Sequence, residues 1–248
     1  MGKTTRKGRK YLWKALGWAT LLALWFFLAD CALVDKKVIL DPFGTAVNII
    51  TLGQTIQFWL AILYTCVSAV SSFAFAFLLS FIIALSAYLH SKLEGALRPY
   101  ISIMRSTPTV AVILVLFLVV DWNFITFIVA FLVTFPILFE GLLLAFRKVP
   151  ASEIDAAAAL GMSRGQILRH IHLDNMKRDI FSSVRATFGL NLKVVIASEV
   201  LGIPHTSIGL SILVAKQSFN YYDAWTFLVV AVLLTSLLEW GLTRISGT

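Results

Sequence analysis

Long apolar blocks alternate along the chain with short segments that carry most of its charges. An α-helix rises about 1.5 Å per residue, so about 20 apolar residues cross a bilayer core that is roughly 30 Å thick. The pattern therefore predicts an all-α, polytopic membrane protein with about six transmembrane helices. The predicted spans are Ala15–Val34, Phe58–Leu89, Val110–Val120, Phe124–Phe146, Ile180–Leu201 and Ala224–Leu242.

Two of the predicted spans differ from the ideal length. Val110–Val120 is too short to cross the membrane unless its helix begins near Ser102. Phe58–Leu89 is long enough to tilt, or to carry one end beyond the membrane.

Composition also favours a membrane protein. Hydrophobic residues make up 59% of the chain and charged residues 14%, whereas soluble domains average roughly half and a quarter. The net charge of +8 is a poor guide to nucleic acid binding, because in a membrane protein the location of Lys and Arg matters more than their number. Cys31 and Cys66 lie far apart in apolar stretches and predict neither a metal site nor a disulfide framework.

Most basic residues lie on one side of the predicted spans. They are Lys3, Arg6, Lys7, Arg9, Lys10 and Lys14 in the N-terminal tail, Lys92, Arg98 and Arg105 between the second and third spans, and Arg147, Lys148, Arg164, Arg169, Lys177 and Arg178 between the fourth and fifth. The opposite side carries only Lys36, Lys37 and Lys216. This bias predicts that both termini and the 147–178 loop lie in the cytoplasm. We divide the chain into a basic tail (1–14), a first span (15–34) and a membrane core (58–246).

The 149–174 segment predicts a short helix and a sharp turn within this loop. Ser152 and Asp155 have the spacing of an acidic capping box, which predicts a helix that starts near Glu153. The alanine run that follows has a high helix propensity. Gly161 is placed to end the helix in the left-handed conformation.

A second short helix follows the turn. Ser163 and Gln166 form a second capping box, which opens a helix that continues to about His172. Its apolar stripe consists of Ile167, Leu168 and Ile171. We therefore expect a helix–turn–helix between two membrane spans, with an alanine face that a partner can approach closely. A loop that is merely helical is the alternative.

The same segment resembles the EAA loop of binding-protein-dependent ABC permeases, whose pattern is Glu-Ala-Ala, then a glycine four residues on, then Ile-x-Leu-Pro. Asp155-Ala156-Ala157 stands for the first part, Gly161 matches the glycine, and Ile171-His172-Leu173 falls at the expected distance. Two positions depart from the pattern, because Asp155 replaces Glu and Asp174 replaces Pro.

The resemblance continues outside the loop and covers roughly the stretch from Ser102 to the C-terminus. Arg105-Ser106-Thr107-Pro108-Thr109 resembles the entry to the third span in permeases of the nitrate, sulfonate and taurine class. Ala197–Gly202, followed by Gly209-Leu210, resembles the exit of the fifth span in that class.

The resemblance implies a type I ABC importer permease fold in the bacterial inner membrane. In this family the loop helix is a coupling helix that inserts into a separate ATPase subunit. Two ATPases, a second permease subunit and an extracytoplasmic solute-binding protein are the implied partners. ATP and Mg²⁺ would be bound by the ATPases, so we expect no cofactor and no enzymatic activity in this chain. The residues expected to couple to the ATPase are Glu153, Asp155, Ala156, Ala157, Gly161, Arg164, Ile171 and Leu173.

Ionisable residues inside a membrane are costly and are therefore functional candidates. Lys193, near the middle of the fifth span, either lines a path for an anionic or zwitterionic solute or forms an ion pair. Its possible partners are Glu199, Glu140 and Asp223. Arg185 is close enough to the interface to extend its charge to water. The candidate residues of the translocation path are Arg105, Pro108, Glu140, Lys193 and Glu199.

The expected function is that of a permease subunit that imports a small solute of the sulfonate, nitrate-like anion or vitamin-precursor class. A gradient-driven secondary transporter is the alternative, although the sequence shows no internal repeat. Nucleic acid binding is disfavoured, because membrane spans closely flank the segment that resembles a DNA-reading helix. No metal-ligand spacing or Ser/His/Asp set predicts an intramembrane enzyme. The solute and the choice between homodimer and heterodimer stay open.

Overall fold

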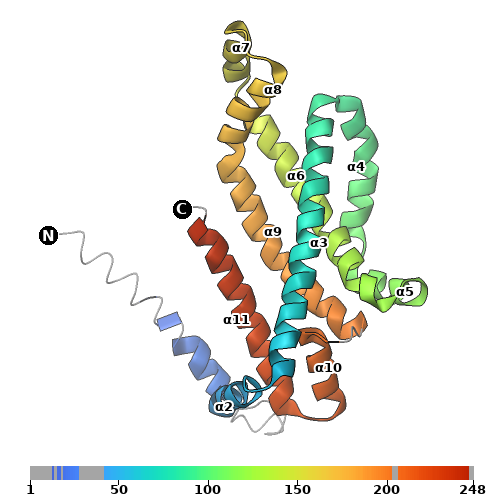
Figure 1. Ribbon diagram of the computed structural model, residues 1–248, viewed down its shortest axis with the longest axis vertical. Helices are drawn as coiled ribbons and strands as arrows, with labels where there is room; N and C mark the ends of the chain where they lie inside the picture. The colour runs from blue at the N-terminus through green and yellow to red at the C-terminus, as the bar shows by residue number, and fades with distance from the viewer. Residues whose placement is uncertain (1–12, 14–15, 18, 28–41, 203–205, 246–248) are drawn as a thin grey trace, which may run out of the picture. The chain divides into compact units, whose positions relative to one another are not determined.

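The computed structural model describes residues 13, 16–17, 19–27, 42–202 and 206–245, and the regular elements among them are all helices (Figure 1). They are α2 (Pro42–Leu52), α3 (Ile56–Leu89), α4 (Ser91–Ser106), α5 (Thr109–Val119), α6 (Trp122–Lys148), α7 (Ala151–Ala159), α8 (Arg164–Ile167), a π-helical turn (Leu168–His172), α9 (Leu173–Gly202), α10 (Ile208–Gln217) and α11 (Tyr221–Ile245). The expected all-α fold is confirmed for this part of the chain.

The chain forms two compact units, Met1–Trp59 with Ser211–Val230 and Leu60–Leu210 with Ala231–Thr248. In the first unit, Asn48 Nδ2 donates hydrogen bonds to Asp223 Oδ1 at 2.9 Å and to Thr226 Oγ1 at 3.0 Å. These bonds connect α2 to the first turns of α11. The second unit contains the 147–178 loop and all the candidate path residues.

Four helices of the described chain are long and apolar enough to cross a membrane. They are Ile56–Leu89, Phe124–Lys148, Arg164–Gly202 and Tyr221–Arg244, and they confirm the second, fourth, fifth and sixth predicted spans. The first predicted span lies partly outside the described residues, and its described positions, 16–17 and 19–27, are helical. The basic tail lies outside the described residues apart from Trp13.

The third predicted span is not a straight helix. α4 and α5 meet at an angle of 95°, and the idea that one helix runs from Ser102 through Val120 is wrong. Pro108 causes the break, because proline has no N–H to donate and disfavours helical geometry in the residue before it. Thr107 is accordingly extended, with φ −76° and ψ 125°. α5 alone, with 11 residues, is about 16 Å long and too short to cross the membrane.

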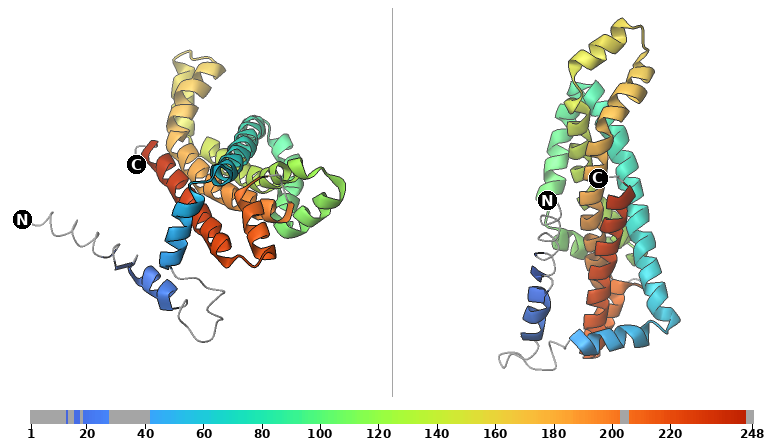
Figure 2. Two further views of the ribbon diagram at one scale, coloured as in Figure 1. Left: turned by 60° about the horizontal axis from the view of Figure 1, so that its bottom comes forward. Right: turned by 90° about the vertical axis from the view of Figure 1, so that its left-hand side faces the viewer.

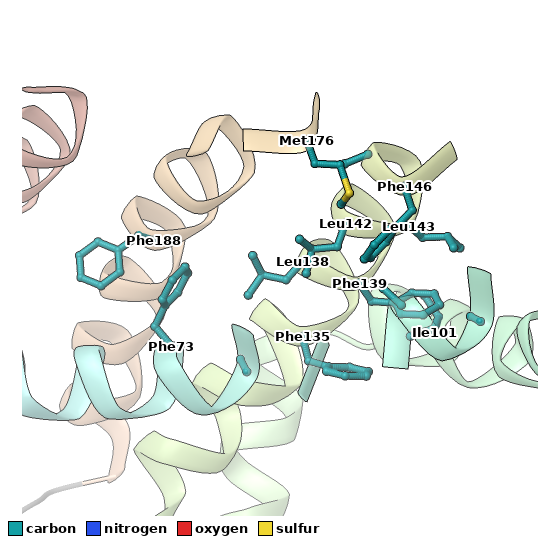
Figure 3. Close-up of a cluster of buried hydrophobic side chains, with 14 of the residues drawn as sticks. Phe73, Ile101, Phe135, Leu138, Phe139, Leu142, Leu143, Phe146, Met176 and Phe188 are labelled. Atoms are coloured by element: carbon teal, nitrogen blue, oxygen red, sulfur yellow. The ribbon is translucent and has the colours of Figure 1, made fainter. Parts of the chain in front are cut away.

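The main hydrophobic cluster of the second unit joins α3, α4, α6 and α9 (Figure 3). α6 is at its centre, since Leu138, Leu142 and Phe146 are completely buried. Phe73 of α3 contacts Phe188 of α9 with ring centroids 5.1 Å apart. Apolar packing therefore fixes α9, which carries Lys193 and Glu199, against α3 and α6.

Hydrogen bonds between helices supplement this packing. Asn191 of α9 donates through Nδ2 to the carbonyl oxygen of Ala69 in α3 at 2.9 Å and accepts from Thr134 Oγ1 of α6 at 2.9 Å. Ser80 of α3 donates to the carbonyl oxygen of Phe135 at 3.0 Å. Because lipid offers no alternative partners for such groups, these bonds help fix the register of the three helices.

Candidate functional site

The loop between α6 and α9 forms a helical projection, α7 and α8, beyond the ends of α3 and α4 (Figures 1 and 2). α7 begins at Ala151, two residues before the predicted start at Glu153, and Pro150 occupies its N-cap position. No side chain caps this end, so the predicted capping role of Ser152 and Asp155 is wrong. Pro150 has the φ angle required at a helix entry, so the helix starts earlier in the sequence than predicted. Ser152 therefore lies inside the helix and not at its cap.

Gly161 ends α7 as predicted, in the left-handed region with φ +82°. The N–H of Met162 donates to the carbonyl oxygen of Ala157 at 3.1 Å, and the N–H of Gly161 donates to that of Ala158 at 3.0 Å. These two bonds form a Schellman motif, which supplies hydrogen-bond donors to two carbonyl groups at the end of the helix. The turn is therefore hydrogen-bonded within its own segment.

The second predicted capping box is present. The N–H of Gln166 donates to Ser163 Oγ at 3.3 Å, and the N–H of Ser163 donates to Gln166 Oε1 at 2.8 Å. The predicted end of this helix near His172 is wrong, because the helix continues through the π-helical turn into α9. Asp174 explains the continuation, since it stands where the EAA pattern has a helix-breaking proline. One helix of 39 residues, Arg164–Gly202, thus connects the projection to the membrane.

The predicted coupling residues fall into two groups. One group is exposed around the turn at Gly161, which we call the tip, and the other lies where the projection packs on the helices below, which we call the base. Asp155, Ala156, Gly161 and Arg164 are exposed, whereas Ala157 is buried and Ile171 and Leu173 are half-buried. At the base, exposed Glu153 accepts a hydrogen bond from Asn175 Nδ2 at 2.6 Å.

Two features of this loop escaped sequence analysis. Leu160, next to Gly161, is 84% exposed at the tip. A large apolar residue beside a turn glycine is the signal that could have identified it. His172 is buried at the base, where its ring lies 5.2 Å from that of Tyr88 and 6.1 Å from that of Phe146.

The candidate carboxylates of the translocation path have partners other than Lys193. Glu199 is completely buried, accepts from Thr65 Oγ1 at 2.9 Å and accepts from the N–H of Gly209 at 3.2 Å. Glu140 forms an ion pair with Arg105. A pair between Lys193 and Glu199 is geometrically excluded, since six residues rotate a helix by about 240°.

Lys193 is exposed on α9. No ion pair or hydrogen bond of its side chain is present in the described part of the chain. Its ammonium group therefore lies on a membrane-spanning helix without a charged partner among the residues that the structure describes. Pro108, the remaining path candidate, lies at the break between α4 and α5.

A cavity of about 1200 Å³ lies between the first half of α9 and the end of α11. Two of its carboxylates are neutralised, because Lys177 pairs with Asp174 at 2.6 Å and Lys148 pairs with Asp179 at 2.9 Å. Three further charged residues line the cavity without an ion pair among the described residues. They are Arg178, Arg185 and Glu239.

Glu239 was missed in the sequence, although it is a carboxylate inside the sixth predicted span. Its side chain lies against Gly189 of α9, and a Cβ atom at Gly189 would be 1.9 Å from Glu239 Oε1. Gly189 therefore leaves the room that this carboxylate occupies beside Arg185, which lies one turn earlier on α9. Arg178, Arg185 and Lys193 therefore make one face of α9 basic.

Comparison with known proteins places the chain in a family. Residues 76–239 match the model of the binding-protein-dependent transport system inner membrane component, and the chain belongs to this family. It is 24% identical over 198 residues to the trimethylamine N-oxide transport system permease protein TmoV of Ruegeria pomeroyi. This alignment covers 79% of the chain but only 29% of the relative's length.

Solved structures share the fold. Two chains from inward-facing conformations of the MetNI methionine ABC transporter superpose with TM-scores of 0.60 and 0.59 at 15% and 16% sequence identity. The first match covers 78% of this chain and 98% of the other, and the second covers 72% and 91%. The expected ABC importer permease fold is thereby confirmed.

Proposed function

We propose that the chain is the membrane-spanning permease subunit of an ABC importer, which couples ATP hydrolysis by separate ATPase subunits to the import of a small solute. The observation that carries this proposal is the α7–α8 projection, an exposed and internally hydrogen-bonded helical unit between two membrane-spanning helices. Such a unit is suited to contact with a soluble partner in the cytoplasm, and the positive-inside bias supports that orientation, with both termini on the same side.

The continuity of α8 with α9 supports a direct route for coupling. A force on α8 acts on a single helix that also carries Arg185 and Lys193. A conformational change driven by ATP needs contacts that differ between two states, and the exposed tip with Leu160 provides a surface for them. ATP and Mg²⁺ would then be bound by two ATPase subunits and not by this chain.

The charged face of α9 supports a path for a solute with an acidic group. Arg178, Arg185 and Lys193 offer three cationic side chains without partners in the described chain, and Glu239 supplies one carboxylate. The charge of Lys193, near the middle of the span, requires water, a solute or a second subunit beside it, because an uncompensated charge is costly in a bilayer. We therefore propose a dimer of like or related permease subunits, supplied by an extracytoplasmic binding protein. A sulfonate, a nitrate-like anion or a vitamin precursor fits this charge pattern.

The test is capture of an ATPase by the tagged chain from detergent-solubilised membranes, with the bound protein identified by mass spectrometry. We expect the wild-type chain to retain an ABC ATPase and Gly161→Val to lose it, because a β-branched residue cannot adopt φ +82° without strain. Gly165→Val is the matched control, since Gly165 lies close by with open space around its Cβ position and no positive φ.

Two results would oppose the proposal. A folded wild-type chain that retains no ATPase would favour a gradient-driven carrier. Equal loss in Gly161→Val and Gly165→Val would mean that the geometry of the turn is not what the ATPase recognises.

A further inference from the structure

A second cavity, of about 710 Å³, lies between one face of α4 and the last turns of α6. It is separate from the α9–α11 cavity and contains none of the coupling residues. Five charged residues line it, three arginines and two glutamates. They are Glu94, Arg98, Arg105, Glu140 and Arg147. Three positive charges minus two negative charges leave a net charge of +1 in the cavity.

The carboxylates engage only part of each arginine. Glu94, whose side chain is 8% exposed, accepts a hydrogen bond from Arg98 Nη2 at 2.8 Å. It also forms an ion pair with Nη2 of Arg147. Arg105 pairs with Glu140 through Nη1. A guanidinium has five N–H donors, and the side chains of Arg98, Arg105 and Arg147 are 71%, 53% and 47% exposed. Several donors therefore stay available for an anion with more than one oxygen atom.

The position of the cavity relates it to the membrane surface. α6 ends at Arg147 and Lys148, so the cavity lies where a membrane-spanning helix meets the headgroup region. Part of its wall is apolar and includes Ile101, Phe139 and Leu143, which belong to the hydrophobic core. The exposed side chain of Leu144 continues this apolar surface outward.

We propose that the α4–α6 cavity binds the phosphate headgroup of an acidic phospholipid. Arg98, Arg105 and Arg147 supply N–H donors to the phosphate, and the apolar wall contacts the glycerol and the first methylene groups of the acyl chains. Phosphate chemistry alone would also accept a soluble phosphate ester. The apolar wall beside the arginines favours the lipid, because a soluble anion gains nothing from it.

The bound lipid would stabilise the contact between α4 and α6. Two ion pairs already connect these helices, Glu94 with Arg147 and Arg105 with Glu140. A phosphate between the arginines would reduce their mutual repulsion and join both helices through one ligand. The proposal does not depend on the identity of the transported solute or on ATPase binding.

The experiment is native mass spectrometry of the delipidated full chain with phosphatidylglycerol or phosphatidylcholine of the same acyl chains. We expect one phosphatidylglycerol to be retained in preference to phosphatidylcholine. Arg98→Gln should weaken phosphatidylglycerol binding about tenfold, because it removes charge-assisted hydrogen bonds. Glu94 keeps its pair with Arg147 in this variant, so the buried carboxylate stays compensated.

Lys92→Gln is the matched control, since it removes the same charge from an exposed position on α4 outside the cavity. Melting of both variants without lipid reports on folding, and Arg105→Gln replaces Arg98→Gln if the latter does not fold. Equal retention of the two lipids, or equal weakening by the Arg98 and Lys92 variants, would overturn the proposal. Glycerol 3-phosphate that competes as well as phosphatidylglycerol at equal concentration would identify a soluble anion site instead.

Discussion

The two ends of the long helix Arg164–Gly202 are held in different ways. At the α8 end, Ser163 and Gln166 exchange hydrogen bonds across three residues, and Gly161 supplies the turn. At the other end, Glu199 binds Thr65, which lies 134 residues away in the sequence, and the N–H of Gly209 at the start of α10. The first end is therefore stabilised by its own segment, whereas the second depends on the packed bundle.

This difference separates two tasks. Under the proposed function, the α8 end keeps its shape while a partner ATPase binds and leaves, because its polar backbone groups are satisfied locally. The Glu199 end fixes α9, α3 and α10 to one another and should move only with the whole bundle. Substitutions at the Glu199 end should accordingly affect folding. Substitutions at the α8 end should affect partner binding.

The largest expected effect is at the Glu199 end. A Cβ atom at Gly209 would lie 2.4 Å from Glu199 Cβ, 2.7 Å from the carbonyl oxygen of Ile196 and 2.7 Å from the amide nitrogen of Val200. Backbone atoms cannot move aside cheaply, so Gly209→Ala should lower the free energy of unfolding by about 3 kcal/mol. SDS titration in mixed micelles measures this change.

Gly202→Ala is the control for this prediction. Its Cβ would meet Ile125 at 3.6 Å, which is ordinary van der Waals contact. Similar unfolding free energies for the two variants would show that the Glu199 end is not tightly packed, and the contrast between the ends would fail.

At the α8 end, partner binding should change without a change in folding. Leu160→Asp replaces an 84% exposed apolar side chain with a charge, so the melting temperature of the isolated chain should stay the same. Capture of the ATPase should fall about thirtyfold, because the loss of one buried leucine costs about 2 kcal/mol. Ser152→Asp adds the same charge near the start of α7 and should retain most of the ATPase. If Leu160→Asp captured the ATPase as well as the wild-type chain, the tip would not be part of the surface that contacts the ATPase.

The middle of the helix tests the proposed path between these two ends. In a variant with its native cysteines replaced by serine, Lys193→Cys should react with a membrane-impermeant thiol reagent about tenfold faster than Leu237→Cys, because reaction requires a thiolate in contact with water. Leu237 is the matched control, an exposed apolar residue on α11. Equal rates of labelling would place both faces in the same surroundings and contradict a water-filled path along α9.

Sequence alone predicted the parts of the fold that depend on local chemistry. Hydrophobic block length identified four spans, the glycine rule identified Gly161, and the capping rule identified Ser163 with Gln166. It failed where two local rules competed. At the start of α7, Pro150 took the position that a capping serine would need. Before α5, Pro108 divided a span that hydrophobicity alone would have extended toward Ser102.

The charged residues show the other limit. The rotation of about 240° between Lys193 and Glu199 was available from the sequence and argues against their pairing. The actual partner of Glu199, Thr65, depends on how α3 packs on α9, which no local pattern encodes. Glu239 was identifiable as a carboxylate within a predicted span, but its position against Gly189 follows only from helix packing. Sequence reasoning therefore found the charges and could not assign their surroundings.

The smallest expected effect tests local capping at the α8 end. Ser163→Ala removes the acceptor for the N–H of Gln166 and should destabilise the first turn of α8 by about 1 kcal/mol, which corresponds to roughly fivefold faster amide exchange there. Ser152→Ala should leave exchange in α7 nearly unchanged, because Ser152 lies inside the helix and caps nothing. Hydrogen exchange with mass spectrometry measures both segments in one sample. Equal acceleration by the two variants would mean that side-chain capping does not hold the α8 end, whose stability would then depend, like that of the Glu199 end, on distant contacts.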